Sequence, residues 1–346
     1  MDLERFTHIV ERRITEWLQA QEKTAPNHEA KILLERMRTL ISRGGKRIRP
    51  QLLYMTYVAY GGNAKESEAL INLGVALELH HQFLLIHDDI MDSDTVRYDG
   101  PNITGYYRQD NLSQENLPET MALLAGDLLF SFSNEVIIKD KKLTDKEKIA
   151  LLMLLHDTNI GVGYGQQLDI LSTNDIVNFT EEKLIVTHRL KAALYTTQLP
   201  MLSAATLLGL NPDEKKKIHR FTEPFGIFFQ LIDDYSDYFN NDSAFNNRPK
   251  YRDIKQGKVT YPFYIALKLA KPEEAKYIKR CFGNKELTGT SIKKVVAILE
   301  KCGAKKASQV FAETYFMQAK SALADLAIDV TAQRIFTALI EQYRIS

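Results

Sequence analysis

Apolar residues recur along most of the chain with the three- and four-residue spacing of amphipathic helices. In the amino-terminal segment, for example, the apolar residues are Leu3, Phe6, Val10, Ile14 and Trp17. The sequence contains no series of segments in which apolar and polar residues alternate between tight turns, as they do in half-buried strands. It therefore predicts an all-α fold.

The breaks between the predicted helices fall at prolines and at polar segments. The prolines leave about ten helical stretches between them, and Pro224 is expected to kink the helix that contains it. Residues 240–253 are rich in turn formers and make the clearest long loop, which could act as a lid. No linker rich in glycine, serine or proline divides the chain, so a single domain, residues 1–346, is predicted.

Composition and charge exclude several classes of protein. Of the 346 residues, 45% are hydrophobic and 26% are charged, and the formal net charge of +1 gives no general attraction to nucleic acid. The longest unbroken apolar run, 149–155, is far shorter than the roughly 20 residues that span a bilayer. The two cysteines, Cys281 and Cys302, lack a paired metal-ligand spacing. We expect a cytoplasmic protein with no transmembrane segment and no nucleic-acid partner.

Two clusters of aspartates each follow a strongly apolar run. The stretch ELHHQFLLIHDDIMDSDTVR contains the first cluster, and FGIFFQLIDDYSDYF contains the second. In the first, Asp88 and Asp92 are one helical turn apart on one face, and Asp89 flanks them. Like charges at this spacing repel, and one isolated DDxxD would equally fit a solvated acidic face. Its repetition after a second apolar run favours a function.

Carboxylates at the end of a buried helix are costly unless a cation neutralises them. Magnesium prefers hard oxygen ligands and keeps open positions for water and phosphate. Two acidic helix ends facing each other across a cavity would hold a magnesium-bound polyphosphate. A diphosphate held in this way becomes a good leaving group, and an apolar helical interior would house a hydrocarbon tail and exclude water.

A basic segment, SRGGKRIRP, places Lys46, Arg47 and Arg49 directly after two glycines. It could be a solvated turn or a weak nucleic-acid patch. Alternatively, the glycines allow close backbone approach, and the cations converge on a second diphosphate. Because no aspartates accompany it, this diphosphate would not be ionised.

Taken together, these motifs resemble those of the trans-isoprenyl diphosphate synthases, the polyprenyl synthetase family that includes farnesyl and geranylgeranyl diphosphate synthases. The matching segments are GGKRIRP, DDIMD followed by Arg97, GQQLD, Lys191 within RLKAALY, FQLIDDYSD and DIKQGK. The resemblance implies a bundle of about ten or more helices around a deep central cavity, usually as a homodimer. It also implies the magnesium-assisted, head-to-tail condensation of isopentenyl diphosphate with dimethylallyl, geranyl or farnesyl diphosphate.

The same resemblance assigns roles to individual residues. The magnesium ligands would be Asp88, Asp89, Asp92, Asp233, Asp234 and Asp237, with Asp233 the direct ligand in the second cluster. Isopentenyl diphosphate would contact Lys46, Arg49 and His81. The allylic diphosphate would contact Arg97, Lys191 and Lys258, with Gln166, Asp169 and Gln230 as polar support. The residues closest to the chemistry would be Asp88, Asp89, Asp92, Asp233 and Lys191.

The chain departs from the family pattern at several positions. Tyr98 replaces a second arginine that would contact isopentenyl diphosphate, so this site is expected to be weaker unless Arg47 compensates. Ala192 stands where a threonine is common. In the long loop, Asn247 and Arg248 replace a glycine and a lysine.

Product length is expected to depend on the residues below the first cluster. Position 83 lies about 7.5 Å along the helix from Asp88, given a rise of about 1.5 Å per residue. It is Phe83, and the next residue is Leu84. One aromatic residue here, with no insertion in the cluster, resembles the short-chain geranylgeranyl synthases. A twenty-carbon product is expected, with fifteen carbons as the alternative, unless Phe83 is only a core residue.

Two other functions remain open. A class I terpene cyclase also ionises a diphosphate with DDxxD, but cyclases usually carry an asparagine/serine/glutamate motif at the second metal site and lack GGKRIRP. A non-catalytic partner subunit of a prenyl synthase would explain Tyr98. Such a subunit, however, has no reason to keep both acidic clusters intact.

Overall fold

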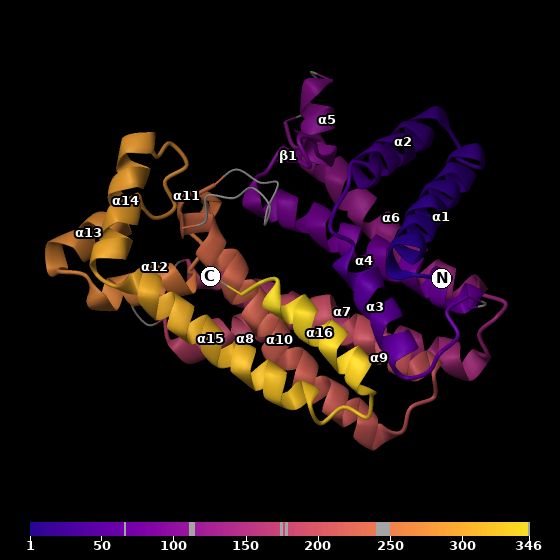
Figure 1. Ribbon diagram of the computed structural model, residues 1–346. Coiled ribbons are helices and arrows are strands. Elements are labelled where there is room, and N and C mark those ends of the chain that lie inside the picture. The colour runs from indigo at the N-terminus through magenta and orange to yellow at the C-terminus, as the bar shows by residue number, and fades with distance from the viewer. Residues whose placement is uncertain (66, 111–114, 174–175, 177–178, 240–249, 345–346) are drawn as a thin grey trace. The chain divides into compact units, whose positions relative to one another are not determined.

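The computed structural model describes residues 1–65, 67–110, 115–173, 176, 179–239 and 250–344 (Figure 1). Nearly all of these residues lie in helices, which confirms the predicted all-α fold. The only strands in the described ranges are two short ones, β1 (Val96–Arg97) and β2 (Gly100–Pro101), which pair as an antiparallel hairpin.

The chain divides into two compact units. Unit 1 comprises Met1–Leu154 and Ser203–Leu210, and unit 2 comprises Leu155–Leu202 and Asn211–Ser346. The helices α7 (Asp145–Ser172) and α9 (Leu199–Leu207) each have residues in both units. That the whole chain forms a single domain stays a prediction.

Unit 1 is built around one long apolar helix. Its helices are α1 (Leu3–Lys23), α2 (His28–Ser42), α3 (Ile48–Ala59), α4 (Glu68–Asp92), α5 (Ile103–Gln109) and α6 (Leu117–Lys139). Helix α4 packs along α6 and also contacts α1 and α3. At Gly74, an added Cβ would lie only 2.9 Å from the Val10 side chain, so the glycine permits the close approach of α1. This packing buries α4 on nearly all sides up to its acidic end.

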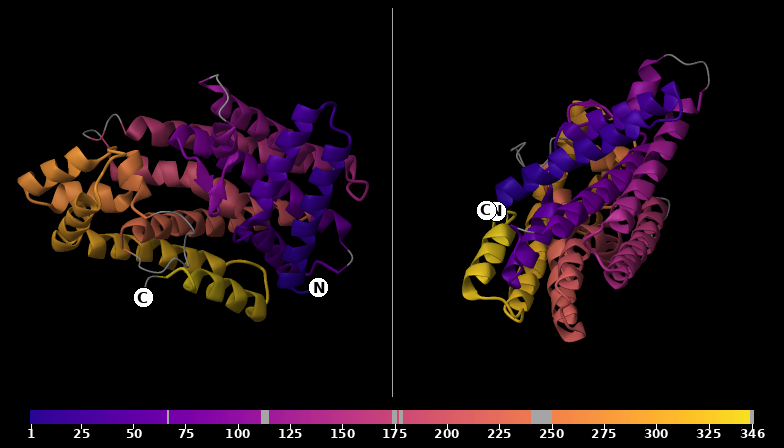
Figure 2. Two further views of the ribbon diagram at one scale, coloured as in Figure 1. Left: turned by 90° about the horizontal axis from the view of Figure 1, so that it is seen from above. Right: turned by 90° about the vertical axis from the view of Figure 1, so that its right-hand side faces the viewer.

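Unit 2 is organised around a second long helix, α10. Its helices are α8 (Glu181–His188), the π-helical η1 (Arg189–Gln198), α10 (Pro212–Phe239), α11 (Arg252–Gln256), α12 (Tyr261–Leu269), α13 (Pro272–Cys281), α14 (Gly289–Lys301), α15 (Ala304–Leu323) and α16 (Val330–Glu341). Helix α10 packs against η1 and α15. Helix α15 also contacts α16, and these last two helices lie side by side at the yellow end of the colour scale in Figures 1 and 2. Pro224 lies inside α10, which continues to Phe239.

The core of unit 2 is rich in phenylalanine. On α10, Phe221 stacks on Phe225, with ring centroids 5.7 Å apart, and also contacts Phe336 of α16. One turn further, Phe228 contacts Phe316 of α15 at 5.6 Å. These apolar contacts hold α10 in place up to the second aspartate cluster.

Two helices of the described chain, α4 and α6, have the length and composition of membrane-spanning helices. Core helices of other proteins pass the same test, and the most apolar stretch of α4 is 83% buried, as expected of a core helix. The corresponding stretch of α6 is only 39% buried. An unbroken apolar run identifies neither helix, because polar residues interrupt both.

Candidate active site

The first aspartate cluster forms the carboxyl-terminal end of α4. Ser67 caps the other end of this helix, and Ser93 ends it in a left-handed conformation with φ of 59°. The N–H of Asp94 then donates to the carbonyl of Asp89 at 2.8 Å. Asp88 and Asp92 are half-buried, whereas Asp89 is buried. The helix thus presents two carboxylates to its surroundings and turns the third inward.

Asp89 and Arg97 form a buried, bidentate ion pair. The Nε of Arg97 lies 3.0 Å from each Asp89 carboxylate oxygen, and Nη2 donates to Oδ1 as well. Burial alone would lower the pKa of Arg97, but the Asp89 carboxylate raises it above its usual value. The structure therefore brings together one predicted magnesium ligand and one predicted diphosphate contact.

The hairpin that carries Arg97 folds back onto the end of α4. Its two turn residues, Tyr98 and Asp99, have φ of 52° and 56°, the conformation of a tight two-residue hairpin turn. Asn102 closes the base of the hairpin, because its N–H donates to the Thr95 carbonyl at 3.0 Å and its side chain donates to the Asp94 carbonyl at 2.9 Å.

The basic segment forms a loop between α2 and α3. Gly44 and Gly45 have φ of 132° and 127°, which residues with a side chain rarely adopt. Lys46 at the start of the predicted anion site is exposed, and Arg49 is half-buried. A Cβ added at Gly45 would lie 3.2 Å from the Tyr98 hydroxyl. The tip of the hairpin therefore reaches the glycine loop.

Arg47 does not face an anion site. Its side chain is buried and donates to Glu78 at 2.7 Å, to Glu11 at 3.0 Å and to the Ile41 carbonyl at 2.7 Å. Glu78 is itself only 1% exposed. This ion-pair network anchors the glycine loop, so Arg47 is not available to replace the missing second arginine.

The histidines of α4 differ in their surroundings. His81, the predicted diphosphate contact, is half-buried, and His80 is buried. The ring of Phe83 lies 4.8 Å from that of His87, 5.6 Å from that of His80 and 5.1 Å from that of Phe130 on α6. Leu84 beside it is half-buried. Phe83 thus belongs to an aromatic cluster between α4 and α6.

In unit 2, a long π-helical segment carries Lys191. Opposite it, α7 has Gly165, where an added Cβ would lie 2.4 Å from the backbone nitrogen of Lys191. This close approach lets the Lys191 ammonium donate to the carboxylate of Asp169, while Gln166 beside it is half-buried. Wide π-helical turns are frequent at functional sites. The structure therefore brings three of the predicted residues of GQQLD and RLKAALY together.

The second aspartate cluster lies near the carboxyl-terminal end of α10. Asp233 is half-buried and Asp234 is buried. Asp234 accepts a hydrogen bond from Gln230 at 2.8 Å, and its other oxygen lies 3.1 Å from Nε2 of the buried His188. Gln230 thus supports the acidic cluster itself.

Asp237 is held by the start of α11. Its carboxylate accepts from the backbone N–H groups of Arg252 and Asp253 at 3.1 and 3.2 Å. Burial raises the pKa of Asp237 to about 6, and the charge of the neighbouring Asp233 carboxylate also raises it. The two backbone hydrogen bonds lower this pKa, but by less. Burial and the charges of Asp237 and Asp234 also raise the pKa of Asp253 well above its usual range. Lys258, whose N–H donates to the Asp253 carbonyl at 2.8 Å, provides an opposing charge.

Both acidic ends fit magnesium. Among the described residues, no three histidine, cysteine or carboxylate side chains form a closed metal cage. Magnesium is usually held by one or two carboxylates together with water and substrate phosphate, so it does not require such a cage. The crowded carboxylates near Asp237 carry the charge that a divalent cation would neutralise.

Residues 30–299 match the family model described as polyprenyl synthetase. The chain belongs to the polyprenyl synthetase family. It is 30% identical over 261 residues to the short chain isoprenyl diphosphate synthase of Methanocaldococcus jannaschii, covering 75% of this chain and 74% of that one. It is 33% identical over 273 residues to the farnesyl diphosphate synthase of Haemophilus influenzae, covering 76% and 85%.

A solved structure is similar over the whole length. It is the geranylgeranyl pyrophosphate synthase from Corynebacterium glutamicum complexed with isoprenyl diphosphate and magnesium, with a TM-score of 0.91, 26% identity and 99% of each chain covered. This polyprenyl synthetase is therefore a prenyltransferase of the short-chain prenyl diphosphate synthase type with an all-α isoprenoid synthase fold.

Several residues of this polyprenyl synthetase were not identified from the sequence. His188 and Asp253 surround the second acidic cluster, and Glu78 and Glu11 hold Arg47. The sequence does indicate that Glu78 is unusual, because this charged residue directly follows a run of apolar residues in a predicted helix. The predicted lid, 240–253, lies mostly outside the described residues, as do Asn247 and Arg248.

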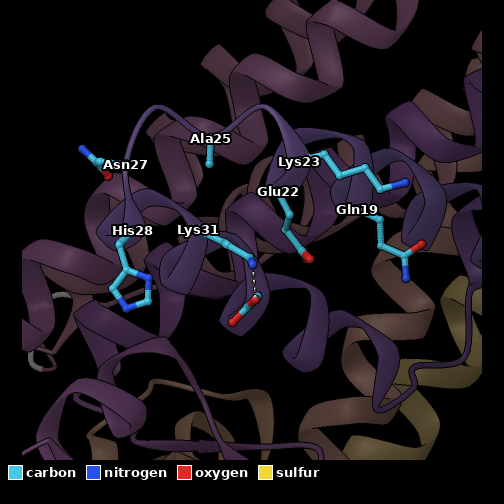
Figure 3. Close-up of a pocket in the computed structure, with 8 residues that line it drawn as sticks. Gln19, Glu22, Lys23, Ala25, Asn27, His28 and Lys31 are labelled. Atoms are coloured by element: carbon cyan, nitrogen blue, oxygen red, sulfur yellow. Dashed lines mark ion pairs between the residues drawn. The ribbon is translucent and has the colours of Figure 1, made fainter.

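A hollow of about 640 Å³ lies between α1 and α2, and none of the residues that line it is a predicted site residue (Figure 3). It is lined by residues of mixed charge that include Glu22, Lys23 and His28. Lys31 and Glu35, which also line it, pair at 3.9 Å. This open, charge-balanced surface has no feature of the prenyltransferase chemistry.

Proposed function

We propose that this polyprenyl synthetase condenses isopentenyl diphosphate head-to-tail with an allylic diphosphate to give geranylgeranyl or farnesyl diphosphate. One observation carries the proposal. Within unit 1, the glycine loop with Lys46 and Arg49 lies against the hairpin that directly follows the acidic end of α4. A proposed anion site of Lys46 and Arg49 beside a proposed magnesium cluster is the arrangement that a reaction between one ionised and one intact diphosphate requires.

Different residues bind the two diphosphates. Lys46, Arg49 and His81 hold isopentenyl diphosphate. Arg97, Lys191 and Lys258 hold the allylic diphosphate, and Asp169 orients Lys191 through their ion pair. Gln166 adds polar support beside Asp169, and Gln230 orients Asp234.

Magnesium would be held by Asp88, Asp92 and Asp233, with Asp89, Asp234 and Asp237 completing the acidic ends. When bound, it neutralises the charge that develops on the leaving diphosphate. Asp89 also orients Arg97, and Arg97 in turn contacts the allylic diphosphate. Arg97 therefore connects the first cluster to this diphosphate. The apolar walls of the helices keep water from the allylic cation.

We propose a twenty-carbon product, with fifteen carbons as the alternative. The support is the aromatic cluster of Phe83, Phe130 and His80, which lies one to two turns below Asp88 on α4 and across to α6. Leu84 lines the neighbouring position. The relatives include both farnesyl and geranylgeranyl synthases, so their names leave both lengths open.

We also propose a cytoplasmic homodimer that pairs through α6. This helix carries large apolar side chains that are 37–53% exposed, namely Leu123, Leu124, Leu128 and Ile138. Exposed apolar side chains of this kind are typical of a protein interface, and a second copy would cover them symmetrically. Both cysteines are free thiols, as expected in a reducing compartment.

Incubation of the purified protein with magnesium and labelled isopentenyl diphosphate, together with each allylic primer in turn, tests the proposal. We expect label in prenyl diphosphates of fifteen or twenty carbons, and none when magnesium is chelated. A class I cyclase would instead release hydrocarbon from the allylic substrate without consuming isopentenyl diphosphate. Absence of turnover with every primer would identify a non-catalytic partner subunit.

A further inference from the structure

Arg43, at the end of α2, links the glycine loop to the hairpin. Its guanidinium Nη1 donates to the Pro101 carbonyl at 2.7 Å and reaches the Arg97 carbonyl at 3.5 Å. Nη2 donates to the Tyr106 hydroxyl, and the guanidinium lies 5.3 Å from the centre of the Tyr106 ring. One side chain thus holds both strands of the hairpin and the helix that follows it.

The hairpin has a matching feature at Gly100. A Cβ added there would lie 2.5 Å from Nη1 and 2.7 Å from Cζ of Arg43, so a side chain at position 100 would displace the guanidinium from this place. The contact between Arg43 and the hairpin is therefore built from both sides.

This contact fixes the position of Tyr98. The two carbonyls that Arg43 reaches belong to Arg97 and Pro101, which flank the turn at Tyr98 and Asp99. The Tyr98 hydroxyl meets the glycine loop at Gly45, two residues after Arg43 itself. Loop and hairpin are consequently held together by the side chain of a residue that immediately precedes the loop.

Arg97 is fixed in a different way. Its guanidinium is buried and forms a bidentate pair with Asp89 on α4, which does not involve Arg43. Loss of Arg43 would therefore loosen Tyr98 while the Arg97 guanidinium keeps its partner. The two diphosphate contacts of the hairpin can be separated by experiment.

We propose that Arg43 is a positioning residue that holds the Tyr98 hydroxyl over the glycine loop, where this hydroxyl donates a hydrogen bond to isopentenyl diphosphate. The inference rests on the proposed function and adds a ligand to its second diphosphate site. The tyrosine hydroxyl is a neutral hydrogen-bond donor. Because Arg43 holds it in place before the substrate binds, it loses less entropy on binding.

The kinetic test compares Arg43→Met with the matched control Arg36→Met. Arg36, also on α2, pairs with Asp110 and lies 4.2 Å from the centre of the Tyr107 ring. It shares the Tyr106 ring with Arg43, at 5.5 Å, but makes none of Arg43's hydrogen bonds to the hairpin carbonyls. We expect Arg43→Met to raise the KM for isopentenyl diphosphate about fivefold to tenfold, as loss of one or two hydrogen bonds does. The KM for the allylic substrate and kcat should stay within about twofold, and Arg36→Met should leave both KM values unchanged.

Tyr98→Phe and the Arg43→Met/Tyr98→Phe double variant show whether Arg43 acts through Tyr98. Tyr98→Phe should raise the same KM by a similar factor, and the double variant should equal either single variant, because both remove one contact. Multiplied effects in the double variant would overturn the inference. So would an Arg43→Met variant with the KM of Arg36→Met.

Amide hydrogen exchange provides a readout without turnover. Residues 95–101 should exchange faster in Arg43→Met than in wild type or Arg36→Met, and equal rates would overturn the positioning role. If wild type forms no product with any primer, the proposed function fails, whereas this measurement still tests the contact.

Should Arg43→Met not fold, Gly100→Ala displaces the guanidinium from the hairpin side. An unchanged KM for isopentenyl diphosphate in Gly100→Ala would then contradict the inference.

Discussion

Two buried arginines, Arg47 and Arg97, each neutralise carboxylates inside unit 1. Arg47 pairs with Glu78 and Glu11, and Arg97 pairs with Asp89. Removing one member of a buried pair leaves the other charge without compensation, which costs about 3–5 kcal/mol. Acidic residues of one cluster can therefore differ sharply in their effect on stability.

The first prediction compares Asp88→Ala with Asp89→Ala. Asp89→Ala should lower the free energy of unfolding by about 3 kcal/mol, because it leaves Arg97 buried without its partner. Asp88→Ala should change it by less than about 0.5 kcal/mol or raise it slightly, since it relieves repulsion between like charges. Urea denaturation without substrates measures both values. Equal destabilisation would contradict the difference in their environments.

The second prediction concerns Tyr98→Arg, which restores the arginine usual in the family. A charge-assisted contact to a diphosphate contributes roughly 1.5–3 kcal/mol, so the KM for isopentenyl diphosphate should fall about tenfold or more. Arg47 cannot already supply this contact, because its guanidinium is occupied by two glutamates. Asp99→Asn, which also makes the net charge more positive by one at the next and exposed turn residue, is the control. If both variants lower KM equally, general attraction explains the effect and Tyr98 makes no specific contact.

At the scale of elements, packing between helices decides what each long helix can do. The α4–α6 contact gathers Phe83, His80, His87 and Phe130 into one cluster below the first acidic end. In unit 2, the contact of α7 with η1 at Gly165 and the contact of η1 with α10 at Gly226 bring Lys191 and His188 to their aspartates.

The third prediction is that Phe83→Ala lengthens the product. Removing the ring opens space in the aromatic cluster, and the chain should then grow to twenty-five carbons or more. Leu84→Ala, one residue along the same helix, is the matched control and should change the product less. Mass spectrometry of the prenyl alcohols after dephosphorylation gives the lengths. An unchanged distribution in Phe83→Ala would show that another side chain stops the growing tail.

The sequence predicts helices better than it predicts their local distortions. Apolar periodicity and prolines locate α4 and α10, because a single amphipathic or apolar run fixes each of them. The hairpin at Tyr98 and Asp99 escapes such reasoning, since tyrosine does not favour the left-handed conformation that both residues adopt. The π-helical η1 also depends on close contacts at Gly165 and Gly226 with distant segments.

The site residues follow the same division. Motif spacing predicts Asp88, Asp233 and Lys191 as site residues, and the first two lie on helices that their own apolar runs predict. It does not distinguish Arg47, which is buried, from Lys46 and Arg49, because burial depends on Glu78 and Glu11 elsewhere in the chain. For the same reason the pairing of Asp89 with Arg97 becomes evident only from the structure.

At the scale of the whole molecule, the exposed apolar face of α6 supports a fourth prediction. Light scattering after gel filtration should give about twice the chain mass of 39.6 kDa. Leu124→Glu combined with Leu128→Glu should lower this to a single chain, because it places charges in an apolar interface. The control is Val310→Glu combined with Met317→Glu on α15, where both residues are also exposed. A wild-type protein of single-chain mass would contradict the dimer.

The central claim, that both aspartate clusters act on one allylic diphosphate, is tested most directly by a double-mutant cycle. It uses Asp88→Asn, Asp233→Asn and the double variant, with the exposed Asp213→Asn of α10 as the control. Each single change should lower kcat on the order of 100-fold, because the interaction forms mostly in the transition state. If the clusters act together, the double variant should lose less than about tenfold more than either single variant. Independent losses that multiply to about 10,000-fold, or near-normal turnover in either single variant, would contradict the account.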